Sequence, residues 1–162
     1  MATSFHVDII VLMMINFASD HAGFLLKRTL VPFVQELGHD TQDLGPEFLV
    51  EGDDYPLIVA EAARRMSKES GARAIIIGGS GQGEAIVANR FPRVRAAVYY
   101  GGSLDIVRLS REHNDANVLS LGARFVSEDE AKAAVRLWLE TPFSGDERHV
   151  RRIAEIDQLM QS

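Results

Sequence analysis

The chain has 162 residues, of which 46% are hydrophobic and 25% charged. A chain of this length buries about two thirds of its unfolded surface around one core, so the numbers predict a single domain over residues 1–162. The 17 basic and 23 acidic side chains give a net charge of −6, which argues against nucleic acid as a partner because phosphate backbones attract basic surfaces. The absence of cysteine excludes disulfides, thiolate nucleophiles and cysteine-bound metals.

The N-terminal segment is apolar over residues 5–18, as a signal peptide or a membrane span would be. Polar side chains interrupt the run, it lacks a basic flank, and it is shorter than the roughly 20 residues that a span needs. A buried strand is the better interpretation, and we expect a cytoplasmic protein without membrane contact. Met13 and Met14 come just before the strand segment that begins at Ile15, and either could be the first residue of the working domain. Residues 1–13 are therefore interpreted as an N-terminal extension.

Short apolar runs alternate with segments of helical period along the whole chain. In chain order the pattern predicts a strand at 9–18, a helix at 22–37, a strand at 39–44, a helix at 54–70, a strand at 73–77, a helix at 84–91, a strand at 94–100, a helix at 103–112, a strand at 117–121, and helices at 127–140 and 146–160. Ser127, with Glu130 three residues later, has the spacing of a capping box at the start of a helix.

Strands without polar alternation, joined by helices, are typical of a parallel sheet that is covered on both faces. The order of elements therefore predicts an α/β protein with a doubly wound, five-stranded parallel sheet in a three-layer α/β/α arrangement. In such sheets ligands bind at the carboxyl ends of the strands. This rule directs attention to Ser19-Asp20-His21, to the loop at 78–84 and to the turn after the fourth strand.

The loop Gly-Gly-Ser-Gly-Gln-Gly at 78–83 lies between a buried strand and a helix start. Its glycines let several backbone N–H groups point at one anion or oxyanion. It is not a P-loop, a dinucleotide fingerprint or a hydrolase elbow, because the residues that those motifs require at their last positions are missing. Glu84 follows the loop directly. This carboxylate either offsets the helix dipole or takes part in chemistry.

Further polar groups allow both a structural and a functional interpretation. Asp20 has the position of a helix cap, and His113-Asn114-Asp115 is typical of a turn. Arg148 and Arg152 share a helical face, which is either a solvated surface or a grip for a phosphate dianion. No group of His, Asp and Glu has the spacing of metal ligands, so the sequence predicts no metal.

Taken in order, these segments resemble the ribose-5-phosphate isomerase type B family, which includes galactose-6-phosphate and allose-6-phosphate isomerases. The resemblance runs from about residue 15 to about residue 155. Its motifs are Ser19-Asp20-His21-Ala22-Gly23, Asp54-Tyr55-Pro56, Gly79-Ser80-Gly81-Gln82-Gly83-Glu84, Ala88-Asn89-Arg90, Arg111-Glu112-His113-Asn114-Asp115-Ala116-Asn117-Val118, Gly122-Ala123-Arg124 and Arg148-His149-Val150-Arg151-Arg152.

The resemblance implies the interconversion of ribose 5-phosphate and ribulose 5-phosphate through an enediolate, without a cofactor. One branch of the family uses a Cys just before the glycine loop as its base, where this chain has Gly78. The other branch has a Glu after the loop, so the resemblance assigns proton transfer to Glu84. It also implies that Ser80 bonds the reacting oxygens and that the loop stabilises the enediolate through the N–H groups of Gly79, Gly81 and Gly83.

For the rest of the substrate, the resemblance implies that His113 assists ring opening with support from Asp20. It implies that Asn114 holds sugar oxygens. The phosphate would be gripped by His21, Arg124, Arg148 and Arg152. In this family the site is built across a homodimer interface and the neighbouring subunit supplies the His-Asn segment, while pairing into tetramers stays open. Arg151 is left as a surface or partner-facing residue.

Other functions stay open from the sequence. The loop after Gly45 and the residues Tyr99 and Tyr100 allow a reshaped pocket, so a hexose 6-phosphate such as galactose or allose 6-phosphate is an alternative substrate, although packing is the more ordinary role of the two tyrosines. A non-catalytic sugar-phosphate-binding module would keep the loop and the arginines without needing Glu84. A hydrolase using Ser80 and His113 would lack a proper elbow.

Overall fold

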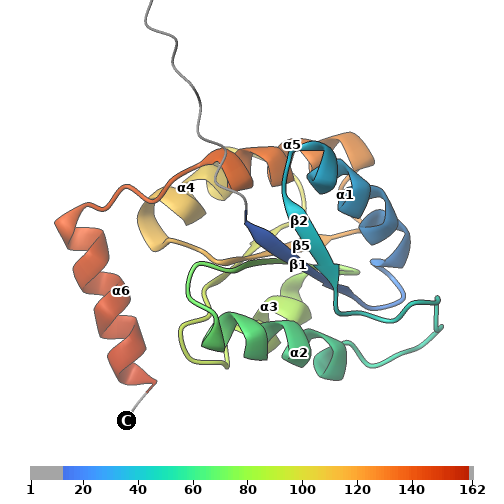
Figure 1. Ribbon diagram of the computed structural model, residues 1–162, viewed down its shortest axis with the longest axis horizontal. Coiled ribbons are helices and arrows are strands. Elements are labelled where there is room, and N and C mark those ends of the chain that lie inside the picture. The colour runs from blue at the N-terminus through green and yellow to red at the C-terminus, as the bar shows by residue number, and fades with distance from the viewer. Residues whose placement is uncertain (1–12, 161–162) are drawn as a thin grey trace, which may run out of the picture.

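A computed structural model describes residues 13–160 of the chain, and Figure 1 shows its sheet between layers of helices. The five strands pair in parallel in the order β2-β1-β3-β5-β4. Their bounds are β1 Met14–Ser19, β2 Asp40–Asp43, β3 Arg73–Gly78, β4 Ala96–Tyr99 and β5 Val118–Gly122. The predicted doubly wound α/β fold is confirmed. The first residues of the predicted strand at 9–18, and the extension at 1–13 apart from Met13, lie outside the described residues.

Helices cover both faces of this sheet. Their bounds are α1 Phe24–Glu36, α2 Tyr55–Lys68, α3 Gln82–Ala88, α4 Asp105–Asn114, α5 Glu128–Glu140 and α6 Glu147–Leu159. In Figure 1, α1, α4 and α5 lie above the sheet and α2 and α3 lie below it, while α6 stands apart at the left. The predicted capping box is confirmed: Ser127 Oγ accepts from the Glu130 amide, and the Glu130 carboxylate accepts from the Ser127 amide.

The two faces of the sheet explain why the central strands β1, β3 and β5 are largely continuous apolar runs, unlike the polar edge strand β2. In β3, Ile75 and Ile77 pack into the hydrophobic cluster between the sheet and helices α1 and α5. Ala74 and Ile76 pack into the cluster on the other face, between the sheet and α2. Because successive side chains point to opposite faces and both faces are buried, no polar alternation is left. None of the helices within residues 13–160 is long and apolar enough to cross a membrane.

The chain leaves the sheet in opposite directions after β1 and β3, which pair side by side with Ser19 opposite Ile77. From β1 the chain continues into α1 above the sheet, and from β3 it continues into α3 below it (Figure 1). Where two neighbouring parallel strands continue to opposite faces of the sheet, a crevice forms between their carboxyl ends. The fold therefore places the residues after β1 and β3 around one crevice.

Candidate active site

A cavity of about 460 Å³ opens at the carboxyl ends of β1, β3 and β5. It is lined by Asp20, His21, Ala22, Tyr55, Gly79, Ser80, Gly83, Glu84, Arg124 and Phe125. Seven of these were site residues in the sequence-based prediction: Asp20, His21, Gly79, Ser80, Gly83, Glu84 and Arg124. They come together because each follows the end of a neighbouring parallel strand or begins the helix behind it.

The glycine loop is held against the end of β5. The carbonyl oxygens of Gly78, Gly79 and Gly81 accept hydrogen bonds, respectively, from the Ala123 amide at 2.8 Å, the Arg124 amide at 3.1 Å and Ser120 Oγ at 2.6 Å. Gly81 has φ +75°, and a Cβ there would lie 2.9 Å from the backbone of Leu121. Only glycine tolerates both conditions. Three anchored carbonyls fix the path of the loop beside the cavity.

Glu84 lies in the first turn of α3, and its side chain is only 4% exposed. Its carboxyl group rests against the backbone of Gly78, so closely that a Cβ on Gly78 would overlap it. Burial raises the pKa of Glu84 above that of an ordinary glutamate, its own backbone amide works against this by hydrogen bonding, and the charge of Asp20 adds to the rise. A carboxylate with increased proton affinity is suited to general base catalysis.

Asp20 is buried opposite Glu84, with 6% of its side chain exposed. Its Oδ1 accepts a hydrogen bond from the Gly23 amide at 3.1 Å, just before α1 begins. The prediction that Asp20 caps the following helix is wrong: the N-cap of α1 is Gly23, and no side-chain hydrogen bond caps the helix, because one further turn separates Asp20 from its start. Asp20 stabilises that turn instead, and the same side chain also lines the cavity.

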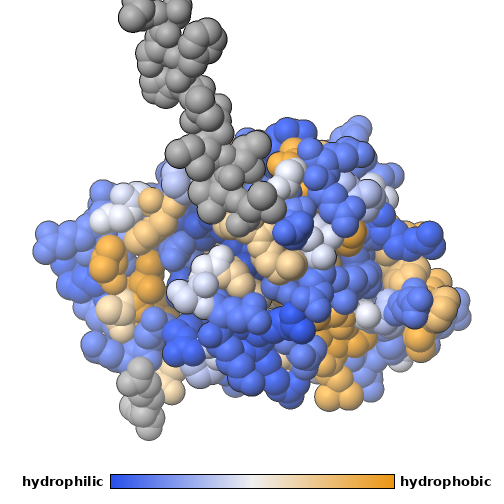
Figure 2. All heavy atoms as spheres, in the orientation of Figure 1, coloured by the Kyte–Doolittle hydropathy of each residue, from blue (hydrophilic) through white to orange (hydrophobic). Residues whose placement is uncertain are grey.

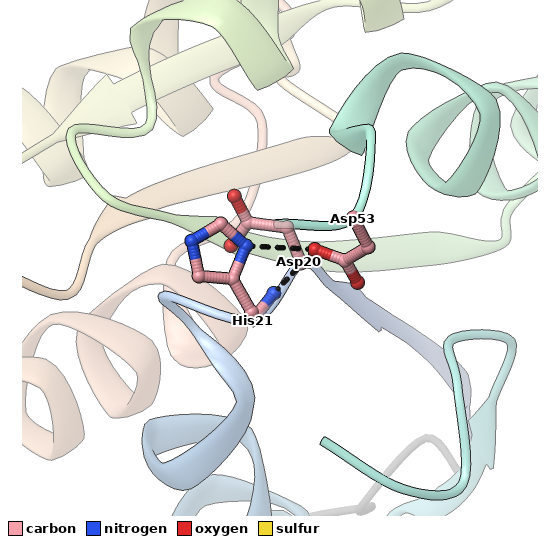
Figure 3. Close-up of side chains that lie close together, drawn as sticks. All are labelled: Asp20, His21 and Asp53. Atoms are coloured by element: carbon pink, nitrogen blue, oxygen red, sulfur yellow. Dashed lines mark hydrogen bonds and ion pairs between the residues drawn. The ribbon is translucent and has the colours of Figure 1, made fainter. Parts of the chain in front are cut away.

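His21 is held by a residue from a distant loop, as Figure 3 shows. Asp53 Oδ1 lies 2.8 Å from His21 Nδ1 and accepts the His21 amide at 2.9 Å. Ligand atoms of Asp20, His21 and Asp53 lie within 4.8 Å of one another, a set of residue types that can bind a metal ion. No metal was predicted from sequence spacing, because Asp53 lies 32 residues away from His21.

Of the five remaining predicted site residues, Gly81 belongs to the glycine loop beside the cavity, and the other four form a second group outside it. His113 and Asn114 end α4 just before the amino end of β5, and Arg148 and Arg152 lie on α6. The His113 ring stacks on that of His149, with 4.4 Å between centroids and 16° between planes. Since β5 has five residues at about 3.3 Å each, the two edges are roughly 15 Å apart. One chain does not bring the two groups together.

A larger cavity of about 550 Å³ lies at the amino edge of the sheet and contains none of the predicted site residues. Its walls include Arg73, Arg95 and Arg111. These guanidinium groups donate to main-chain oxygens at the ends of α4 and α5, including Trp138, Asp115 and Thr141. These arginines are occupied in holding the main chain together. The smaller cavity, which contains the predicted site residues, is therefore the candidate active site.

Comparison with known proteins identifies the family of the chain. The family model described as Ribose/Galactose Isomerase matches residues 15–156. The chain belongs to the ribose/galactose isomerase family. The family predicted from the ordered motifs is thereby confirmed.

Several members of this isomerase family are similar over nearly the whole chain. The ribose-5-phosphate isomerase B of Mycobacterium tuberculosis is 38% identical over 141 residues, covering 87% of this chain and 86% of the relative. The Escherichia coli enzyme of the same name is 36% identical over 147 residues, covering 91% and 96%. The structure of ribose-5-phosphate isomerase B from Mycoplasma genitalium with bound ribulose-5-phosphate superposes with a TM-score of 0.87 at 34% identity, covering 93% of this chain and 97% of that one.

Three residues that line the cavity, Ala22, Tyr55 and Phe125, are absent from the sequence-based prediction of the site. A Cβ on Gly83 would lie 2.5 Å from the hydroxyl oxygen of Tyr55. The motif Asp54-Tyr55-Pro56 belongs to the family resemblance and so contained a signal for Tyr55, but no site role follows from it alone. Phe125 lines the cavity next to Arg124, and nothing in the sequence distinguishes it from a surface residue. Tyr99, by contrast, is 3% exposed and belongs to the core.

Proposed function

We propose that this protein interconverts ribose 5-phosphate and ribulose 5-phosphate, with Glu84 as the base. The carboxylate removes the proton from C2 of the open-chain aldose and returns it to C1, while the hydroxyl proton moves from O2 to O1. Hydrogen is only redistributed within one molecule, so the step needs no redox cofactor. The observation that carries the proposal is a carboxylate only 4% exposed, with a raised pKa, in the cavity beside a glycine loop.

The groups around Glu84 suit an enediolate intermediate. The glycine loop is anchored by its carbonyls, and we assign the amides of Gly79, Gly81 and Gly83 to the negative oxygen, where each donor contributes on the order of 3 kcal/mol. We assign Ser80, which lines the cavity, to the reacting oxygens. Asp20 raises the proton affinity of Glu84 and also supports ring opening.

The phosphate and the ring oxygen of the sugar need the second group of residues. We assign His21 and Arg124 in the cavity to the phosphate, together with Arg148 and Arg152 from α6. We assign His113 to ring opening and Asn114 to the sugar hydroxyls. Since one chain keeps the two groups at opposite edges of the sheet, we propose that two copies pair so that each cavity is completed by its neighbour.

Exposed apolar side chains support the pairing. In α6 only His149 is buried, while Val150 and Ile156 on the helix and Met160 just after it are about half exposed. Figure 2 shows the resulting apolar surface at the left of the molecule, where α6 lies. Large apolar side chains also lie within three residues of cavity residues, and these are Leu25, Leu57, Ile86 and Phe125. A second copy would cover both surfaces.

Mixing two inactive variants tests the shared site. Glu84→Gln and His113→Ala would each inactivate both sites of a homodimer. If subunits exchange at random, half of the dimers are hybrids with one intact site each, so roughly a quarter of wild-type turnover returns. Mixtures that stay inactive although exchange is shown by mass spectrometry contradict a shared site. Light scattering of the wild type decides between dimer and tetramer.

A substrate panel tests the reaction itself. We expect turnover of ribose 5-phosphate to exceed that of galactose 6-phosphate and allose 6-phosphate. A preference for a hexose phosphate would keep the mechanism and replace the substrate. Binding of all three without turnover would identify a non-catalytic sugar-phosphate module. The cytoplasmic location expected from composition stays a prediction that fractionation of cells tests.

A further inference from the structure

Asp53 is hydrogen-bonded to His21, but none of the catalytic or binding roles proposed above involves Asp53. One oxygen, Oδ1, receives both the backbone amide and the Nδ1 atom of His21, at 2.9 and 2.8 Å. The Asp53 side chain is only 11% exposed, and its second oxygen is buried without a hydrogen-bond partner among the described residues. Burying a charged carboxylate costs free energy unless strong hydrogen bonds compensate for the lost water, so the two bonds to His21 are important for keeping Asp53 in place.

The geometry decides which atom of His21 faces the cavity. With Nδ1 bonded to Asp53, the other ring nitrogen, Nε2, points away from Asp53 (Figure 3). His21 lines the cavity and 32% of its side chain is exposed, so Nε2 is the atom available to a ligand. The Asp53 carboxylate can only accept a hydrogen bond, so it keeps a proton on Nδ1 of His21 and fixes the rotation of the ring. Carboxylates orient metal-binding histidines in the same way.

The segment that carries Asp53 is anchored at its far end. Between β2 and α2 the chain runs through residues 44–54, and near its start the buried Lys27 ammonium lies 2.8 Å from Asp43 Oδ2 and 3.4 Å from the Pro46 carbonyl oxygen. Asp43 Oδ1 in turn accepts the Gly45 amide at 2.9 Å. At the other end Asp53 is followed by α2, whose first residue, Tyr55, lines the cavity. A loop held at both ends can place a carboxylate reproducibly.

We propose that Asp53 is a positioning residue that holds the His21 ring with Nε2 directed at the phosphate of the substrate. When the ring carries both protons, Nδ1–H donates to Asp53 and Nε2–H donates to a phosphate oxygen. The Asp53 carboxylate holds the ring in this orientation, so Nε2 is already directed at the dianion before it binds, and less binding free energy is lost in ordering the ring. The inference rests on the proposed function for the identity of the phosphate ligand, and on the geometry alone for the state of the His21 ring.

Two readouts test the role of Asp53. In long-range proton–nitrogen spectra of the wild type at alkaline pH, the neutral His21 ring, assigned with His21→Gln, carries its proton on Nδ1. Asp53→Ala releases that proton from Nδ1. The dissociation constant of inorganic phosphate and the KM for ribose 5-phosphate both rise roughly 10-fold, while kcat stays within about twofold. Asp53→Asn keeps an acceptor oxygen without charge, so it keeps the Nδ1 proton and weakens phosphate binding less.

The control is Glu51→Gln, which removes one exposed negative charge from the same loop and leaves both readouts unchanged. Variants with wild-type phosphate affinity, or a His21 proton on Nε2 in the wild type, overturn the proposal. If Asp53→Ala does not fold, Asp53→Asn and the wild-type spectrum still decide. A wild type that binds phosphate and shows the Nδ1 proton but turns over no sugar phosphate contradicts the proposed function and leaves the pairing intact.

Discussion

The carboxyl group of Glu84 occupies the space that a side chain at position 78 would need. Gly78 ends β3 directly before the glycine loop, and a Cβ added to it would overlap Glu84 Oε1. In the family branch with a cysteine at this position, the reactive group comes from β3 itself. Here the proposed base, Glu84, comes from α3 and reaches back over a glycine, so under this proposal the two branches would bring different groups to the same point.

Gly78→Ala tests this arrangement. The added methyl group displaces the Glu84 carboxyl group, and we expect kcat to fall by at least about 100-fold, because general base catalysis contributes roughly 10²–10⁴-fold and needs correct placement. Phosphate binding stays within a few-fold of the wild type. The measurement is steady-state turnover together with phosphate titration.

The matched control for that variant is Gly71→Ala. Gly71 has φ +83° and nothing within 4 Å of an added Cβ, so alanine there costs about 1 kcal/mol of stability through backbone strain and leaves kcat unchanged. Unchanged turnover in Gly78→Ala would show that Glu84 does not need its observed position.

The pH dependence of turnover follows from the raised pKa of Glu84. A base works only when it is ionised, so kcat/KM falls as the pH drops through a midpoint above the ordinary pKa of a glutamate. Burial is the main cause of the rise, and the charge of Asp20 contributes to it. Asp20→Asn therefore moves the acid midpoint to lower pH, in addition to any loss of rate. An acid limb that is unmoved in this variant would contradict the coupling of the two carboxylates.

The same shift predicts an effect on folding. Because the pKa of Glu84 is higher in the folded than in the unfolded chain, its contribution to stability is present at acid pH and is lost as the pH rises through the folded-state value. Glu84→Gln carries no charge and escapes this loss. Its thermal midpoint should exceed that of the wild type at neutral pH, and the gap should close on acidification. A variant less stable than the wild type at neutral pH would be the opposite result.

The buried ion pair under the loop at 44–54 is predicted to respond asymmetrically to mutation. Lys27 is 1% exposed, whereas the side chain of Asp43 is 41% exposed. Asp43→Ala leaves the buried Lys27 ammonium without its carboxylate partner, and should lower the free energy of unfolding by about 3–5 kcal/mol. Lys27→Met leaves a carboxylate that water can still solvate, so its cost should be nearer about 1–2 kcal/mol. Urea unfolding at neutral pH measures both, and equal costs would contradict the role of burial.

The carboxyl ends of β3 and β5 were predicted to within one residue, because both strands are buried apolar runs that end at glycines, Gly78 and Gly122. It placed the third helix two residues late, since Gly81 in its left-handed conformation already caps α3 and Glu84 falls inside the first turn. The glycine loop drew attention to Glu84 without any structure. The roles assigned to the site residues stay predictions.

Other parts of the site had no readable signal. Asp53 lies in an aperiodic loop, and its contact with His21 depends on how that loop folds back after β2. The separation of His113 from Glu84 follows from chain order, because one residue precedes a strand and the other follows one. Sequence order alone does not show whether a second copy closes that distance.

The central claim is that Glu84 moves the proton. Its most direct test compares wild type and Glu84→Gln in the conversion of ribose 5-phosphate to ribulose 5-phosphate, with EDTA present and with phosphate binding measured on the same samples. We expect wild-type turnover that EDTA does not affect, and a loss of at least about 100-fold in the variant with phosphate affinity retained. A variant that turns over within a few-fold of the wild type would contradict it.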